Sequence, residues 1–220
     1  MKDAGSGPQF EPRWPVALTI VAVIALLAVL PGRVRVFPAW FPYVMGIVVL
    51  VPMAAPRLTG AQPRWLHVER WTTALFFLFG WGGNIACLAY LIHAMVNRPA
   101  DISGLQLLES SIAVWVINVL MFSLLYWQMD RGGPEARVNN AGTRPDWLFP
   151  QMGAAEDAPP DWRPTFVDYL FLGYSTATAF STTDVMPLTS RAKLLMMLES
   201  TISLATIVVV AARAINILGS

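Results

Sequence analysis

The stretch DYLFLGYSTATAFSTTDVMPLT, residues 168–189, joins a short apolar run to a cluster of hydroxyl side chains. Its apolar part, residues 169–180, is shorter than the ~20 residues that a helix needs to cross a hydrocarbon core. Backbone that breaks at membrane depth persists only where it is buried in protein or lines water. The stretch therefore predicts a re-entrant half-helix over 168–180, followed by a filter-like turn at 181–184.

Longer apolar runs flank this stretch. The chain is 55% hydrophobic and only 13% charged, and the charges gather between five runs: 14–30, 36–55, 71–96, 105–128 and 193–218. Tryptophans near the run ends, such as Trp14, Trp71 and Trp127, occupy the positions of an interfacial belt. We predict an all-α, multi-pass integral protein of the cell membrane, with five transmembrane helices plus the re-entrant segment. A signal peptide is the alternative for the first run.

The segments between the runs divide the chain into three parts. Residues 1–13 are polar and glycine-rich, which predicts a disordered tail. Residues 14–104 would form three peripheral helices, and 105–220 a pore-like unit with an outer helix, the re-entrant segment and an inner helix over 190–218. The intervening stretch 130–167 predicts a surface loop that is partly ordered by its bulky apolar side chains.

Residues Thr176 to Asp184, TATAFSTTD, with Pro187 beyond them, resemble the filter pattern TxTTVGYGD of the potassium channel superfamily, which is likewise followed by a proline. The resemblance continues through Arg191 into the inner helix at Leu198-Glu199-Ser200 and covers about 50 residues. It implies a pore helix, a filter and an inner helix that are repeated in a homotetramer around a path for inorganic cations.

The filter-like residues also depart from that pattern. Ser181 and Thr183 stand at the two glycine positions and Thr182 at the tyrosine position, whereas a carbonyl-lined filter depends on conformations that glycine adopts cheaply. We therefore predict a cation path without potassium selectivity, with a ring of Asp184 carboxylates. The residues assigned to this path are Thr178, Ala179, Phe180, Ser181, Thr182, Thr183 and Asp184. The alternative is that the hydroxyls satisfy freed backbone groups and Asp184 caps the next helix.

Two further motifs, WxxDRGGP at 127–134 and AFSxTDxMPL at 179–188, resemble those of an uncharacterised family of bacterial membrane proteins. This second resemblance implies a bacterial inner-membrane protein but does not indicate any particular activity.

The last apolar run has one polar face. Glu199, Ser203, Thr206 and Arg213 recur at spacings of four, three and seven residues, which places them on one side of a helix. A stripe that faces a lumen and a stripe that packs against another helix, with Arg213 reaching the interface, are both open.

Other function classes lack support in the sequence. We find no metal-ligand cluster, phosphate-binding loop or nucleophile motif, so we expect no enzyme activity, no catalytic residue, no metal site, no cofactor and no nucleic-acid partner. Membrane lipid, cations and further copies of the chain are the expected partners. A transporter or solute-binding protein, or a non-conducting structural subunit, remains the alternative. The orientation is also open, since the distribution of Lys and Arg favours the opposite topology from the channel-like one.

Overall fold

The computed structural model describes residues 11–59, 63–97, 103–138, 144–154, 156–159, 162–178 and 185–218. These residues are mostly helical. The longer helices are α1 (Trp14–Val29), α2 (Phe41–Thr59), α3 (Pro63–Asn97), α4 (Gly104–Met129), α7 (Phe166–Thr178) and α8 (Ser190–Leu218). The short elements are the 3₁₀ turn η1 (Asp130–Gly132), α5 (Pro134–Val138), α6 (Pro150–Gly153) and the strands β1 (Trp147–Leu148) and β2 (Met186–Pro187).

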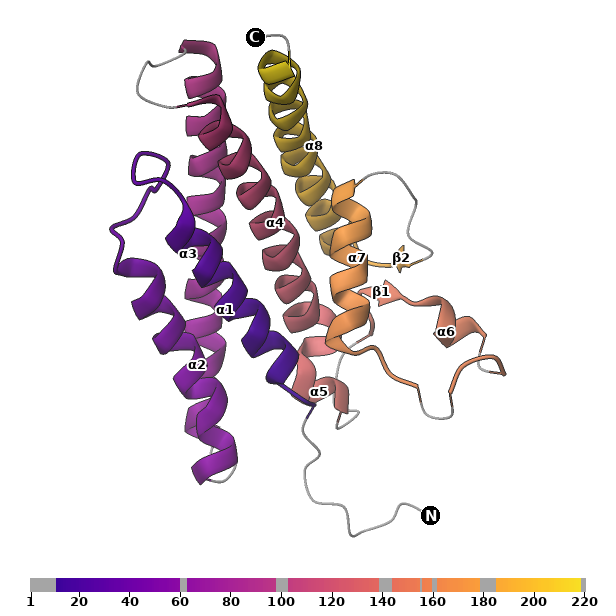
Figure 1. Cartoon of the computed structure of the whole chain (residues 1–220). Helices are drawn as coiled ribbons and strands as arrows, with labels where there is room; N and C mark the ends of the chain where they lie inside the picture. Colours follow the sequence, from indigo (N-terminus) through magenta and orange to yellow (C-terminus); the bar gives the residue numbers. More distant parts are fainter. Residues whose placement is uncertain are drawn as a thin grey trace, which may run out of the picture.

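Helix α4 lies at the centre of the bundle. It contacts α1, α3, α7 and α8, while α2 packs on the outer side against α1 and α3 (Figure 1). In the apolar stretch of α4, 61% of the residues are buried, compared with 33% in α3 and 28% in α8. The core therefore forms around α4, and the other helices each expose one face.

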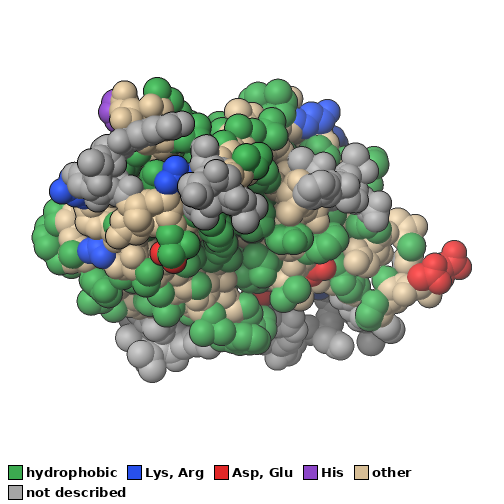
Figure 2. Space-filling view, turned by 45° about the horizontal axis from the view of Figure 1, so that its top comes forward, with side chains coloured by type: hydrophobic (Ala, Val, Ile, Leu, Met, Phe, Trp, Pro, Cys, Tyr) green, Lys and Arg blue, Asp and Glu red, His purple; other side chains and the backbone are tan. Residues whose placement is uncertain are grey.

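Three helices among the described residues are long and apolar enough to cross a membrane: Trp71–Asn97, Gly104–Gly132 and Ser190–Ile215. The helix Trp14–Val29 and the apolar stretch Phe41–Val51 are shorter. Hydrophobic side chains cover most of the face in Figure 2, and the Lys and Arg side chains on it are scattered. The prediction of a helical membrane protein is thus confirmed for three of the five runs.

Local chemistry explains where two of the helices begin. Helix α4 starts with a capping box in which the Gln106 amide donates to Ser103 Oγ (3.2 Å) and the Ser103 amide donates to Gln106 Oε1 (3.1 Å). Helix α2 begins at Phe41 rather than at the predicted residue 36. The chain turns at Pro31, whose carbonyl accepts from the Val34 amide at 2.9 Å, so residues 30–40 form a folded connection and not a helix start.

The predicted surface loop at 130–167 is partly built into the core. Arg131, Gly132 and Gly133 all have positive φ (55°, 83° and 103°), so the chain turns sharply directly after α4. Strand β1 pairs with β2 in an antiparallel ladder, with Trp147 opposite Pro187. Because Trp147 is fully buried beside Tyr126 of α4, this part of the loop is a structural element and not a surface cover.

Candidate functional site

Helix α7 corresponds to the predicted re-entrant half-helix, with bounds of 166–178 in place of 168–180. At its start, the backbone amide and the hydroxyl of Thr165 both donate to Asp168 Oδ2, at 2.7 and 2.8 Å. At its end, Thr178 Oγ1 donates to the Tyr174 carbonyl at 3.0 Å. Thirteen residues give a helix of about 20 Å, which is too short to cross a hydrocarbon core of about 30 Å.

The C-terminal turns of α7 lie against the middle of both α4 and α8. A Cβ atom on Gly173 would lie 3.2 Å from the Val119 carbonyl oxygen and 2.4 Å from Ser123 Oγ, so glycine permits this close approach. Ser200 Oγ donates to the Thr176 carbonyl at 3.2 Å. Val119 follows Asn118, the middle residue of Gly104–Gly132, and Ser200 lies within three residues of the middle of Ser190–Ile215. Helix α7 therefore ends about half-way along both apolar helices.

A band of buried polar side chains joins α8 to α4 at this level. Tyr126 OH donates to Glu199 Oε2 at 2.5 Å, and Asn118 Nδ2 donates to Ser203 Oγ at 2.9 Å. Asn84 of α3 extends the band, since its Nδ2 donates to Asn118 Oδ1 at 3.5 Å. Such hydrogen bonds fix how helices meet where lipid supplies little hydrophobic driving force.

The polar face of α8 can now be placed. Glu199, Ser203 and Thr206 are fully buried, and Thr206 Oγ1 donates to the Ile202 carbonyl of its own helix at 2.8 Å. Arg213 is half-buried, and its Nε donates to the Gly104 carbonyl at the start of α4, at 3.3 Å. Because these contacts turn the face toward α4, we assign it to helix packing, which is one of the two interpretations that the sequence left open.

One buried oxygen atom of α7, Thr176 Oγ1, and one of α8, Glu199 Oε1, have no hydrogen-bond partner among the described residues. Both residues are at least nine-tenths buried. Glu199 Oε1 is also 3.4 Å from where a Cβ of Gly173 would be. Buried polar atoms are normally paired, so α7 and α8 each keep one buried oxygen that no described residue pairs.

Asp130 ties the start of α7 to the end of α4. It is fully buried, and its Oδ2 accepts from Tyr169 OH at 2.6 Å while its Oδ1 accepts from the Asp146 amide at 2.8 Å. Arg137 supports the same place, because its Nη1 donates to the Trp127 carbonyl at 2.8 Å, where α4 ends. One carboxylate thus holds α4, α7 and the segment before β1 together.

Asp146 continues this connection to the start of α8. Its Oδ1 accepts from Thr189 Oγ1 and from Arg191 Nε, both at 2.6 Å, and its Oδ2 accepts from Arg191 Nη2. Its carbonyl oxygen accepts from the Leu188 amide at 2.8 Å. The residues directly after the filter-like segment are therefore fixed at the level of the first turn of α7.

The residues predicted to line the cation path fall largely outside the described residues. Of the seven, Thr178 is the last residue of α7, and Ala179, Phe180, Ser181, Thr182, Thr183 and Asp184 are not described. The structure does describe the residues on both sides: Thr178, about half-way along α4 and α8, and Val185, directly before β2.

The carboxylate network at the end of α4 was not predicted as a site. Trp127 and Asp130 belong to the WxxDRGGP motif, which was the available signal. Tyr169, which donates to Asp130, is 39 residues away in sequence, and Arg191, which donates to Asp146, is 45 residues from that acid. The tail prediction also needs correction, because Glu11 is part of this network. Its carboxylate accepts from Arg137 Nη2 and from Trp127 Nε1, each at 2.9 Å.

Comparison with known proteins adds no relative. No protein-family model, no curated protein and no solved structure matches this chain. Within the ranges that the structure covers, no three His, Cys, Asp or Glu side chains gather in a way that could hold a metal ion.

Proposed function

We propose that this chain is a subunit of a cation channel, in which α4, α7 and α8 serve as outer, pore and inner helices. The observation that carries the proposal is the path of the chain through α7. The helix starts at the Asp130 carboxylate, ends half-way along α4 and α8, and the chain then comes back to Asp146, which is bonded to Asp130. A segment that enters to half depth and returns to the same side is the geometry of a re-entrant pore loop.

The distances suit a turn made by the six residues 179–184. From Tyr169 to Thr178 the helix rises about 14 Å, and six extended residues reach up to about 20 Å. In the proposed channel, the hydroxyls of Ser181, Thr182 and Thr183 and the Asp184 carboxylate, which belong to this connection, serve the cation path. Hydroxyls and a ring of carboxylates favour cations over anions.

The uncovered faces of α7 and α8 support an oligomer. Val167, Phe171 and Tyr174 are more than half exposed and share one face of α7. The exposed large apolar residues described on α8 are Leu194, Met197, Leu204, Val208 and Ile215. In a homotetramer, neighbouring subunits would cover these surfaces around a central path.

Five crossings fit the arrangement of the helix ends. Helix α1 starts at the end of the bundle where α4 ends, and α8 finishes at the opposite end (Figure 1). A chain that starts at one end of the bundle and finishes at the other must cross an odd number of times. Five helices supply these crossings: α1, α2, α3, α4 and α8. The re-entrant α7 leaves this number unchanged.

The decisive experiment measures ion flux through the purified protein in liposomes and planar bilayers. We expect cation-selective currents and a cross-linked tetramer. Asp184→Asn should lower cation conductance and cation-over-anion selectivity several-fold, because four carboxylates are lost from the path. Asp157→Asn, a change of the same chemistry at an exposed loop residue, should leave both unchanged.

A wild-type protein that carries no current and cross-links only as a monomer would contradict the proposal. Equal currents in wild type and Asp184→Asn would instead place the conducting path elsewhere. Cysteine scanning over 178–184 on a Cys87→Ser background gives a second readout. Reactivity toward a charged thiol reagent that declines from one side indicates a water-filled path, whereas protection by one solute indicates a transporter-like binding site.

A further inference from the structure

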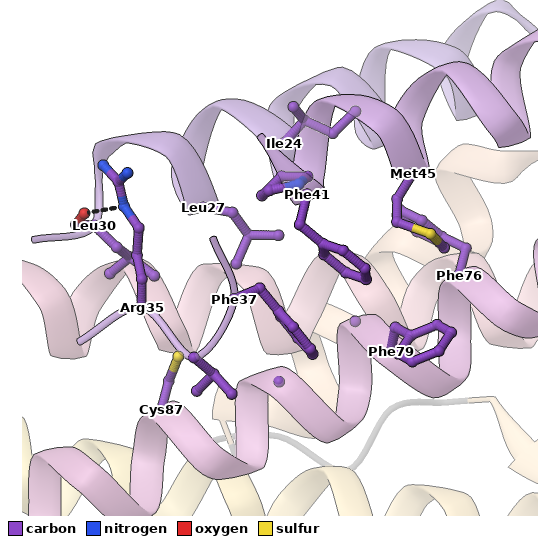
Figure 3. A pocket seen from close by; sticks show the side chains of 14 residues that line it. Ile24, Leu27, Leu30, Arg35, Phe37, Phe41, Met45, Phe76, Phe79 and Cys87 are labelled. Atoms are coloured by element: carbon purple, nitrogen blue, oxygen red, sulfur yellow. Dashed lines mark hydrogen bonds between the residues drawn. The ribbon is translucent and has the colours of Figure 1, made fainter. Parts of the chain in front are cut away.

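A pocket lies between α1, the connection 30–40, α2 and α3 (Figure 3). In Figure 1, α2 and α3 lie on the opposite side of α4 from α7. Its wall is made of aliphatic and aromatic side chains, among them Leu27, Phe37, Phe41, Met45 and Phe79, with one charged residue, Arg35. We call it the α1–α3 pocket. Nothing in the proposed channel uses it.

Aromatic stacking shapes the pocket. Phe37 and Phe41 stack at 4.4 Å between ring centroids, and Phe79 meets Phe41 edge to face at 5.6 Å. Gly83 makes room for this arrangement, because a Cβ atom there would lie 2.8 Å from Cε2 of Phe37. The pocket thus depends on a glycine that brings the α3 backbone close to an aromatic ring.

The mouth of the pocket opens toward the lipid-facing surface. Val36 and Phe79 line it and are still 46% and 39% exposed. Most exposed large residues of the same helix between 71 and 97 are apolar, with His93 and Asn97 exposed near its end; the apolar ones include Trp71, Leu75, Leu78, Ile85, Ile92 and Val96. An occupant would therefore enter from the hydrocarbon phase and not from water.

Arg35 supplies a positive charge at this mouth. Its Nε donates to the Leu30 carbonyl at 2.6 Å and its Nη2 to the Ala28 carbonyl, so the guanidinium caps the C-terminal end of α1. Among the described residues no acceptor for Nη1 is found. Arginine carries five N–H donors in a fixed fork that suits phosphate oxygens. The N–H donors of Arg35 Nη1 are therefore available to bind an anion.

The depth of this charge favours a partner from the membrane. Cys87 Sγ donates to the Val34 carbonyl at 3.2 Å, which places the connection 30–40 beside Cys87. That residue lies ten positions before Asn97, the end of the helix Trp71–Asn97, or about 15 Å along its axis. A cation this far below the helix end is costly without an anion nearby.

We infer that the α1–α3 pocket binds one acyl chain of an anionic phospholipid, whose phosphate is held by Arg35. The aromatic walls receive the chain, and the guanidinium selects the headgroup by charge. A zwitterionic lipid offers the same chain but carries an ammonium group that offsets its phosphate charge. The site is independent of whether the protein conducts ions.

The single cysteine of the chain is a built-in reporter, since Cys87 lines the pocket and is buried. Full-length protein in nanodiscs of phosphatidylglycerol or of phosphatidylcholine is treated with N-ethylmaleimide, and the alkylation rate of Cys87 is measured. Retained phosphatidylglycerol is counted by native mass spectrometry. We expect several-fold slower alkylation and one retained lipid per chain in phosphatidylglycerol.

Three variants distinguish recognition of the headgroup charge by Arg35 from binding of the acyl chain in the pocket. Arg35→Gln should abolish the difference between the two lipids, whereas Arg33→Gln, on the exposed neighbour, should preserve it. Met45→Trp fills the pocket and leaves Arg35 unchanged, so it should remove the retained lipid even if Arg35→Gln proves unstable. Equal protection by both lipids, or unchanged lipid retention in folded Arg35→Gln and in Met45→Trp, would overturn the inference.

Discussion

The α4–α7–α8 unit and the α1–α2–α3 layer use different contacts. Buried hydrogen bonds join the unit, such as those of Asp130, Glu199 and Asn118. In the layer, stacked aromatic rings and the pocket of apolar side chains dominate. Hydrogen bonds have strict geometry, whereas apolar contacts adapt to their surroundings. The unit is therefore suited to holding α7 in a precise position, and the layer is suited to adaptable apolar contacts.

The largest effect is expected where the unit loses its central carboxylate. Asp130→Ala removes the acceptor of two buried donors, Tyr169 OH and the Asp146 amide. Each unsatisfied donor costs about 1–3 kcal/mol, so the variant should unfold at a much lower temperature in detergent, as followed by circular dichroism. Asp157→Ala, at an exposed position, is the matched control.

A double-mutant cycle shows whether that loss comes from the hydrogen bond. Tyr169→Phe should cost stability in the wild type but little in the Asp130→Ala background, because the hydroxyl there has already lost its partner. Additive effects of the two changes would contradict the role assigned to Asp130.

A smaller effect is expected from the close approach of α7 to α4. Gly173→Ala places a methyl group 2.4 Å from Ser123 Oγ and 3.2 Å from a backbone carbonyl, and overpacking of this kind costs about 1–3 kcal/mol. Gly82→Ala in α3 meets nothing within 4 Å and should be neutral or slightly stabilising. Thermal unfolding of both variants, with partial rescue of Gly173→Ala by Ser123→Ala, measures the difference. Equal stability of the two alanine variants would mean that α7 does not pack on α4 in this way.

The smallest effect is expected in the layer. Cys87→Ser keeps a donor for the Val34 carbonyl, which Cys87 Sγ now contacts at 3.2 Å, so stability should change by no more than about 1 kcal/mol. Cys87→Leu is the contrasting variant, since its larger side chain must displace the pocket wall. A loss in Cys87→Ser as great as that in Asp130→Ala would remove the distinction between the two regions.

Much of the helical framework could be predicted from the chain alone. The runs at 105–128 and 193–218 agree closely with α4 and α8, because an apolar segment of that length has few structural options in a membrane. The shortness of α7 was also predictable from its run of about a dozen apolar residues, although both bounds are shifted by two residues, from 168–180 to 166–178. Helix α3 extends further than predicted, to Pro63, because polar residues can continue a helix beyond its apolar part.

The candidate site was less predictable. The sequence placed Glu199, Ser203 and Thr206 on one face of a helix but left open what covers that face. Asp130 stood out only as part of a motif, and Asp146 only as one of several acids in a loop. Their partners come from distant segments, and residue types alone do not say which segments meet.

What the sequence determined by itself was a helical membrane protein with one segment too short to cross, because hydrophobic length and periodicity are local properties. Only the tertiary structure decided that α7 stops half-way along α4 and α8, that Glu199 faces Tyr126, and that two carboxylates fix the chain on either side of residues 179–184. These are contacts between segments, and their geometry is set by which surfaces can approach closely enough to hydrogen-bond.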